Sequence, residues 1–119
     1  MNTLIVDDSK AMRMIVRRTL RQAGFEQLDI TEAENGKDAL EKLRGGEFGL
    51  VLSDWNMPIM GGLELLEAII AESIEVTFGF VTSEGSPEMR SKAKAAGAKF
   101  LITKPFTPQS FEYHLSGVV

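Results

Sequence analysis

The chain has 119 residues, of which 44% are hydrophobic and 25% charged, a balance typical of one compact globular domain and unlike a disordered or fibrous chain. Its net charge of −4 argues against direct nucleic-acid binding, which needs a basic surface to displace counterions. It has no cysteine, which excludes disulfides and Cys-ligated zinc, and no signal-peptide or membrane-spanning pattern, so we expect a cytoplasmic protein.

Short apolar runs alternate with longer amphipathic segments along the chain. The first run, residues 4–6, predicts a buried strand, and the segment from about Ser9 to Gly24 predicts a helix. A second strand is expected over 28–33 and a second helix over 36–44, ended by a pair of glycines. The side chains expected to face the core from these two helices are Met12, Ile15, Val16, Leu20, Ala39, Leu40 and Leu43.

The rest of the chain continues the same alternation. Strands are predicted over 50–52, 76–81 and 100–102, and helices after Gly62, near Pro87 and after Pro108. The side chains expected to face the core from these helices are Leu63, Leu66, Ile69, Ile70, Met89, Ala93, Ala96, Phe111, Leu115 and Val118. Five such units predict an α/β fold with a doubly wound, five-stranded parallel sheet and five helices, in one domain over residues 1–119 with no output domain.

Polar residues directly follow most of the apolar runs. In sheets of this class, ligands bind beyond the carboxyl ends of the strands. Asp7 and Asp8 follow the first run, Asp54 the third, Thr82 the fourth and Lys104 the fifth. If these four strands are neighbours, the five side chains converge in one charged pocket.

Three carboxylates in one pocket repel one another unless a cation compensates their charge. Because the donors are all oxygen atoms, the set favours Mg²⁺, with Mn²⁺ as the alternative. Asp8, Asp54 and one backbone carbonyl are enough for an ion that keeps several waters, and Asp7 can hold one of those waters. A phosphoryl group bridging the metal, Lys104 and Thr82 explains why an ammonium and a hydroxyl face the same pocket.

Four motifs, each after a predicted strand, carry a resemblance to a known family. They are Ile5-Val6-Asp7-Asp8-Ser9, Ser53-Asp54-Trp55-Asn56-Met57-Pro58, Val81-Thr82-Ser83-Glu84 and Thr103-Lys104-Pro105-Phe106. In this order they resemble the receiver domains of response regulators in two-component signalling, over nearly the whole chain. The segment around Asp54 is most similar to receivers of the CheY-like, chemotaxis type. The resemblance implies the strand order 2-1-3-4-5.

The resemblance also implies a role for each residue of the pocket. Asp54 accepts a phosphoryl group from the phosphohistidine of a histidine kinase of the CheA-like type. Thr82 donates to a phosphoryl oxygen, and Lys104 balances the charge of the group. Asp8 and Asp54 bind Mg²⁺ together with the backbone carbonyl of Asn56.

Three further features follow from the same resemblance. Asp7 helps to hold the metal through a water. Asn56 and Glu84 occupy the positions that tune the lifetime of the phosphoryl group. The bond between Lys104 and Pro105 is expected to be cis.

One position departs from the family pattern. The family often carries Tyr or Phe three residues before the lysine, where the ring turns inward on phosphorylation, and this switch position is Leu101 here. Phe100 is adjacent, but alternation along a strand turns it to the opposite face. We therefore expect a weaker or different readout, carried by Thr82 and by repacking of the fourth helix.

The resemblance implies a phosphorylation-activated switch and not an enzyme, apart from its own phosphotransfer and slow autodephosphorylation. Such a switch changes its affinity for a downstream protein, and the sequence around Asp54 favours chemotaxis and a partner such as the flagellar motor switch. A phosphatase is a further candidate partner, whereas direct nucleic-acid contact and membrane insertion are not expected. The alternative is a receiver from a non-chemotaxis or longer regulator.

Two other classes of protein compete with this interpretation. Phosphatases with an aspartyl-phosphate intermediate use similar residues, but their nucleophile lies in an Asp-x-Asp pattern, and the second acid is replaced here by Asn56. The second class is a binding module without phosphorylation, either nucleotide-dependent or an adaptor with a receiver-like fold. No Gly-rich phosphate-binding motif is present, which argues against nucleotide binding, and an inert adaptor has little use for three acids with Thr82 and Lys104.

Single residues of the motifs also have simpler interpretations. An isolated Asp8-Ser9 pair is more often a helix cap, and an isolated Lys104 is more often a solvated loop residue. A local basic cluster near the fourth helix is more typical of a solvated helix face than of a partner site. Its members are Arg90, Lys92, Lys94 and Lys99.

Overall fold

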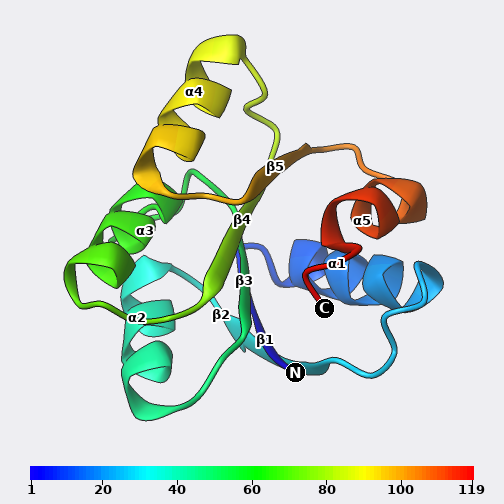
Figure 1. Ribbon diagram of the computed structural model, residues 1–119, viewed down its shortest axis with the longest axis horizontal. Helices are drawn as coiled ribbons and strands as arrows, with labels where there is room; N and C mark the ends of the chain where they lie inside the picture. The colour runs from blue at the N-terminus through cyan, green and yellow to red at the C-terminus, as the bar shows by residue number, and fades with distance from the viewer.

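The structure, a computed structural model, describes residues 1–119 and consists of five strands that alternate with five helices (Figure 1). The strands are β1 (Asn2–Val6), β2 (Asp29–Ala33), β3 (Leu50–Ser53), β4 (Thr77–Thr82) and β5 (Phe100–Thr103). The helices are α1 (Lys10–Gln22), α2 (Gly36–Gly45), α3 (Gly62–Ala71), α4 (Pro87–Ala96) and α5 (Pro108–Leu115). All the strands pair in parallel in the order β2-β1-β3-β4-β5, which confirms the predicted fold class.

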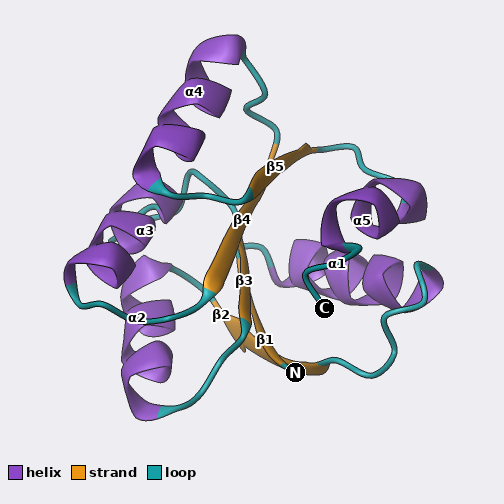
Figure 2. Cartoon of the chain, viewed as in Figure 1, coloured by secondary structure: helices purple, strands orange, loops and turns teal.

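The strand order places helices on both faces of the sheet. After β2 the chain crosses back over β1 to start β3, so the direction of winding reverses between β1 and β3. As a result α1 and α5 cover one face, and α2, α3 and α4 cover the other (Figures 1 and 2). No helix is both long and apolar enough to cross a membrane.

The sheet has a separate hydrophobic core on each face, because successive strand residues point to opposite sides. In β5, Leu101 joins the core beneath α2, α3 and α4, whereas Phe100 and Ile102 join the core beneath α1 and α5. The Phe100 ring lies over Gly79 of β4, where any Cβ would collide with it. The alternation that we expected for Leu101 and Phe100 is therefore confirmed.

The helices begin at side-chain caps that the sequence provides. Ser9, Asn35, Ser86 and Thr107 each accept a hydrogen bond from a backbone N–H of the first helical turn. Gly97 ends α4 in the left-handed conformation, at φ 107°, which a residue without a Cβ adopts at little cost. Local sequence therefore fixes where most of the helices begin.

Several side chains expected to face the core do not. Ile15 is 37% exposed and Ile70 is 59% exposed, because each lies at the edge of its helix's buried stripe. Thr19 and Leu65 are buried on those stripes instead. Leu63 is only half-buried, and Val118 lies beyond the end of α5, although it packs against the core beside that helix.

Candidate functional site

The polar residues that follow four of the strands do converge at one edge of the sheet. Asp7 and Asp8 follow β1, Asp54 follows β3, and Thr82 and Lys104 come at the ends of β4 and β5. Carboxylate oxygens of Asp7, Asp8 and Asp54 all lie within 4.8 Å of one another. We call Asp7, Asp8, Asp54 and Lys104 the acidic pocket.

Lys104 is the cation of the acidic pocket. Its Nζ lies 3.0 Å from Oδ2 of Asp7 and 3.5 Å from Oδ2 of Asp54. The side chains of Asp7, Asp54 and Lys104 are only 6%, 14% and 17% exposed, whereas Asp8 is open to solvent. When all three carboxyl groups are ionised, one ammonium faces three negative charges, so the pocket carries excess negative charge.

The environment of Asp54 disfavours its ionised form. Burial raises the pKa of Asp54 above its ordinary value, and the charge of Asp7 pushes the pKa in the same direction. Lys104, the backbone N–H of Trp55 and the hydroxyl of Thr82 oppose the shift without cancelling it. A further positive charge in the pocket would therefore stabilise the Asp54 carboxylate.

Backbone groups hold the carboxylates in place. The N–H of Ser9 donates to Oδ1 of Asp7 at 2.9 Å, and the N–H of Trp55 donates to Oδ1 of Asp54 at 2.8 Å. The Oδ2 atom of each carboxylate is thus the one that faces Lys104. The sequence motifs identified the acids but not these backbone donors, because any residue with an N–H can supply them.

The donor set of the acidic pocket suits a hard divalent cation. It consists of carboxylate oxygens, with no sulfur or imidazole ligand, and the oxygens are close enough to share one ion. These residues fit Mg²⁺ by their oxygen chemistry and by the excess negative charge of the pocket. Which atoms ligate it, including the Asn56 carbonyl, stays a prediction.

Arg13 of α1 supports the acidic pocket, a role that the sequence patterns did not predict. Its Nη1 donates to the backbone carbonyl of Asp7 at 2.6 Å, and its Nε lies 2.8 Å from Oε1 of Glu32 in β2. Arg17 also pairs with Glu32, at 3.0 Å. Arg13, Arg17 and Glu32, which we call the Glu32 cluster, brace the turn that carries Asp7.

Gly62, the first residue of α3, was also missed as part of the site. A Cβ at Gly62 would collide with the backbone carbonyl of Asp54, so only glycine allows α3 to begin this close to the acid. The pair Gly61-Gly62 in the sequence was the available signal, but it indicated only a turn.

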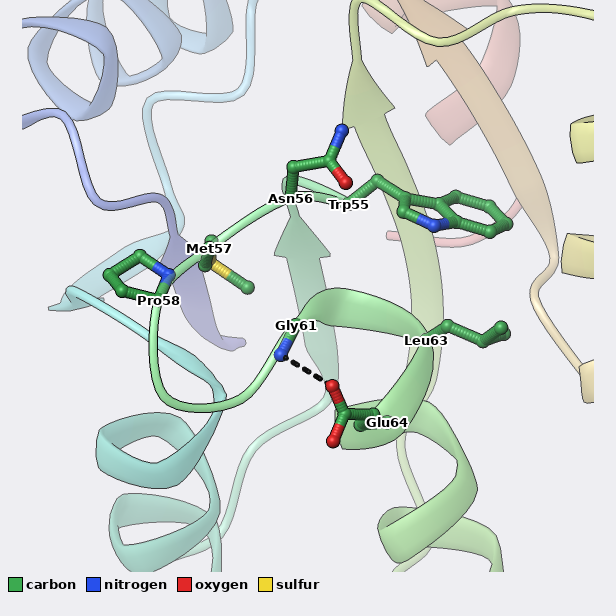
Figure 3. A pocket seen from close by; sticks show the side chains of 7 residues that line it. All are labelled: Trp55, Asn56, Met57, Pro58, Gly61, Leu63 and Glu64. Atoms are coloured by element: carbon green, nitrogen blue, oxygen red, sulfur yellow. Dashed lines mark hydrogen bonds between the residues drawn. The ribbon is translucent and has the colours of Figure 1, made fainter.

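The loop after Asp54 forms a shallow pocket of about 480 Å³ beside the acids (Figure 3). The Trp55 ring and Leu63 lie on one side of this loop and Pro58 on the other, and the N–H of Gly61 donates to Glu64 at 3.3 Å. The Trp55 ring packs against the Phe80 ring, with 4.5 Å between the centroids, so Trp55 is a packing residue. This pocket lacks the acids and Lys104, and we do not assign the chemistry to it.

Asn56 and Glu84 flank the acidic pocket from the loops after β3 and β4. Asn56 is exposed, and its Nδ2 lies 3.4 Å from Oε1 of Glu84, so the two side chains bridge the loops after β3 and β4. The N–H of Glu84 donates to the fully buried Thr82 hydroxyl at 3.2 Å. The bond between Lys104 and Pro105 is cis, which confirms that prediction.

The chain matches one known protein family along nearly its whole length. The sequence profile described as "Response regulator receiver domain" matches residues 3–116. The chain belongs to the response regulator receiver family. Receiver domains are signalling domains and not enzymes in the ordinary sense, so the phosphatase alternative is not supported.

Individual relatives point to the chemotaxis branch of the receiver domains. The chain is 39% identical to the chemotaxis protein CheY1 of Helicobacter pylori, with 100% of this chain and 97% of the relative covered. It is equally identical to a CheY homologue of Campylobacter jejuni, of which it covers 92%. The solved structure of CheY4 from Vibrio cholerae superposes with a TM-score of 0.86 at 35% identity, covering 99% of this chain and 98% of CheY4. The protein is thus a CheY-like, phosphorylation-regulated response regulator.

Proposed function

We propose that this receiver domain is a chemotaxis switch that accepts a phosphoryl group on Asp54 from a histidine kinase, in a reaction that requires Mg²⁺. The single observation that carries the proposal is the convergence of Asp54 with Lys104, Thr82, Asp7 and Asp8 at the carboxyl edge of the sheet. The ammonium beside Asp54 can compensate charge on a phosphoryl group, and the excess negative charge of the pocket favours a metal ion that does the same. A purely structural ion pair would need only as many carboxylates as cations.

The transfer forms an acyl phosphate. An oxygen of Asp54 attacks the phosphorus of the donor phosphohistidine, the P–N bond breaks with its electron pair on the imidazole, and that nitrogen takes up a proton. Lys104 already faces Oδ2 of Asp54 and compensates charge that develops on the phosphoryl oxygens. The Thr82 hydroxyl, buried at the end of β4, donates to one of those oxygens.

The acidic pocket would hold the Mg²⁺ ion. We assign Asp8, Asp54 and the Asn56 backbone carbonyl as its protein ligands, and Asp7 as the residue that holds a bound water. When bound, Mg²⁺ neutralises charge on the transferring phosphoryl oxygens. Asp8 is exposed, which allows it to meet an ion that retains part of its hydration shell.

Asn56 and Glu84 set the lifetime of the acyl phosphate. Their side chains meet across the mouth of the pocket, where a hydrolytic water has to approach Asp54. We expect autodephosphorylation to be slow, because Asn56 occupies the position at which an Asp-x-Asp phosphatase carries its second acid.

The names of the relatives support a role in chemotaxis for this chain. We assign it a CheA-like histidine kinase as donor and a downstream protein such as the flagellar motor switch as target. We further propose that residues 1–119 form one receiver domain, which acts in the cytoplasm by binding its target.

The proposal is tested by labelling with a small phosphodonor, such as radiolabelled acetyl phosphate, with and without Mg²⁺. We expect one acid- and base-labile label per chain in the presence of Mg²⁺ and none after the metal is chelated. Asp54→Asn should abolish the label, whereas Asp38→Asn, in α2, should leave it unchanged. Label that persists in Asp54→Asn would show that another residue is the acceptor.

The same assay separates the switch from a phosphatase. A switch stops at about one phosphoryl group per chain and releases phosphate slowly, whereas a phosphatase turns over a phosphate monoester many times. Rapid multiple turnover would contradict the proposed function.

A further inference from the structure

Arg90 of α4 joins two segments that are distant in the sequence. Its Nε donates to the backbone carbonyl of Gly85, in the loop between β4 and α4, at 3.2 Å. Its Nη1 donates to the backbone carbonyl of Leu101, in β5, at 3.3 Å. The planar guanidinium can donate in two directions at once, which a lysine in its place cannot do in a fixed geometry.

The loop that Arg90 holds begins at the acidic pocket. Thr82 is the last residue of β4, and its hydroxyl accepts from the N–H of Glu84, the residue before Gly85. Gly85 also lies against Thr103 of β5, where a Cβ would collide with the threonine methyl. A change at the Thr82 hydroxyl therefore reaches Gly85 within three residues.

The other end of the bridge lies at a surface hollow between α4 and β5. Arg90 and Leu101 line a hollow of about 450 Å³ together with Phe100 and Lys94. The Phe100 ring stacks on His114 of α5 at 5.5 Å. Arg90 lies close enough to His114 for its charge to help lower the pKa of that imidazole, after the larger effect of burial.

We propose that Arg90 couples the Thr82 end of the acidic pocket to the surface formed by β5 and α5, in the place of an aromatic side chain at position 101. The side chain of Leu101 is buried in the core beneath α4 and has no polar group that could exchange hydrogen-bond partners. Its carbonyl, held by Arg90, supplies the link that its side chain lacks.

The bridge is sensitive to small movements. Both of its hydrogen bonds are near the upper end of the usual distance range, so a relative shift of about 0.5 Å between the loop and β5 breaks one of them. A hydroxyl can accept one hydrogen bond and donate another, so the hydrogen bond from Glu84 is lost only if Thr82 moves. We expect that the Thr82 hydroxyl, when it swings to donate to a phosphoryl oxygen, moves away from the N–H of Glu84, and the loop then loses its tie to β4. Arg90 then has to follow the loop or stay with β5, and in either case its position beside Leu101 and His114 changes.

The inference rests on the proposed function, so its test observes residues at both ends of the Arg90 bridge: those beside the acidic pocket and those beside Leu101. Amide and imidazole resonances are recorded by NMR before and after addition of beryllofluoride with Mg²⁺, a phosphoryl analogue that needs no kinase. In the unmodified protein we expect shifts near Thr82 and Glu84 and also at Leu101 and His114. In Arg90→Gln, the first pair of shifts should persist, and the second should be lost.

Lys94→Gln is the matched control, because Lys94 lies one turn further along α4, lines the same hollow and makes no side-chain hydrogen bond. It should respond like the unmodified protein. Arg90→Lys keeps the positive charge beside His114 but not the two-directional donor, and we expect it to behave like Arg90→Gln.

The other possible results would contradict either the Arg90 bridge alone or the proposed function as well. Full shifts at Leu101 and His114 in Arg90→Gln, or full recovery in Arg90→Lys, would overturn the bridge while leaving the proposed function intact. Loss of the Thr82 and Glu84 shifts in Arg90→Gln would show that Arg90 acts on the pocket itself, which also overturns it. If the unmodified protein gives no shift near Thr82, the proposed function fails and the coupling fails with it.

Discussion

The acidic pocket and the Glu32 cluster are adjacent groups of charged side chains with opposite balances. In the acidic pocket, three carboxylates face the single ammonium of Lys104. In the Glu32 cluster, one carboxylate is paired with the two guanidinium groups of Arg13 and Arg17. Arg13 connects the two groups through the carbonyl of Asp7.

This difference separates a binding site from a structural support. Glu32 already has its cations inside the protein, so it gains little from a ligand. Asp8 has none and is exposed beside two other carboxylates, so a cation from solution improves the pocket. The balance of charge, more than the number of charged residues, therefore indicates where a ligand binds.

The largest expected effect comes from making the pocket more negative. Lys104→Met should lower the free energy of unfolding by roughly 2–3 kcal/mol without metal, because the nearly buried Asp7 carboxylate loses its partner while Lys104 itself retains some exposure. Mg²⁺ should restore part of the loss and bind more tightly, since a competing cation is gone. Urea unfolding and Trp55 fluorescence titration measure both quantities, with Lys37→Met, in α2, as the control. Weaker Mg²⁺ binding in Lys104→Met would contradict this picture.

Asp8→Asn removes charge from the same pocket and should have the opposite pattern. We expect the affinity for Mg²⁺ to fall about tenfold or more, because a direct ligand loses its charge. Stability without metal should stay the same or rise slightly, since one source of repulsion is removed. Isothermal titration with Mg²⁺ gives the affinity, and an unchanged value would show that the metal site is misplaced.

Glu32→Gln tests the compensated cluster. Stability should fall by about 1 kcal/mol, because Arg13 and Arg17 are left facing each other with no carboxylate between them. The affinity for Mg²⁺ should change less than about twofold, because Glu32 is not a ligand. If Mg²⁺ binding falls as far in Glu32→Gln as in Asp8→Asn, the two clusters act as one unit and the distinction between them is wrong.

The smallest effect is expected at the exposed pair of Arg44 and Glu72, which lie 2.6 Å apart on the surface. The hydrogen bond from Arg44 lowers the pKa of Glu72, so any stabilisation is present above the unfolded-state pKa and is lost as the pH falls through the folded-state value. Water and salt screen this pair, and Arg44→Gln should leave the urea midpoint at pH 7 unchanged. An NMR titration should show the pKa of Glu72 returning toward its ordinary value. A clear loss of stability in Arg44→Gln would show that this exposed pair stabilises the fold as the Glu32 cluster does.

Much of the fold could be predicted because the relevant patterns are local. Residues 50–52 form a continuous apolar run in a strand buried on both faces, and Ser86 before Pro87 carries the start of α4. Alternation along a strand is also a local pattern, and it correctly predicted that Leu101 and Phe100 point to opposite faces of the sheet. Ile15 and Ile70 were misplaced because helical spacing identifies a stripe but not how far its neighbours cover it.

The sequence by itself determined which residues reach the site, since each acid, Thr82 and Lys104 comes at the end of an apolar run and parallel strands end at one edge. Only the tertiary structure decided what holds the acids, namely the N–H groups of Ser9 and Trp55 and the guanidinium group of Arg13. It also decided that Arg90 of α4 donates to the Leu101 carbonyl in β5. The reason is physical. A periodic pattern encodes the direction of a side chain from its own strand or helix, whereas a hydrogen bond between α4 and β5 depends on a distance that exists only after the sheet has formed.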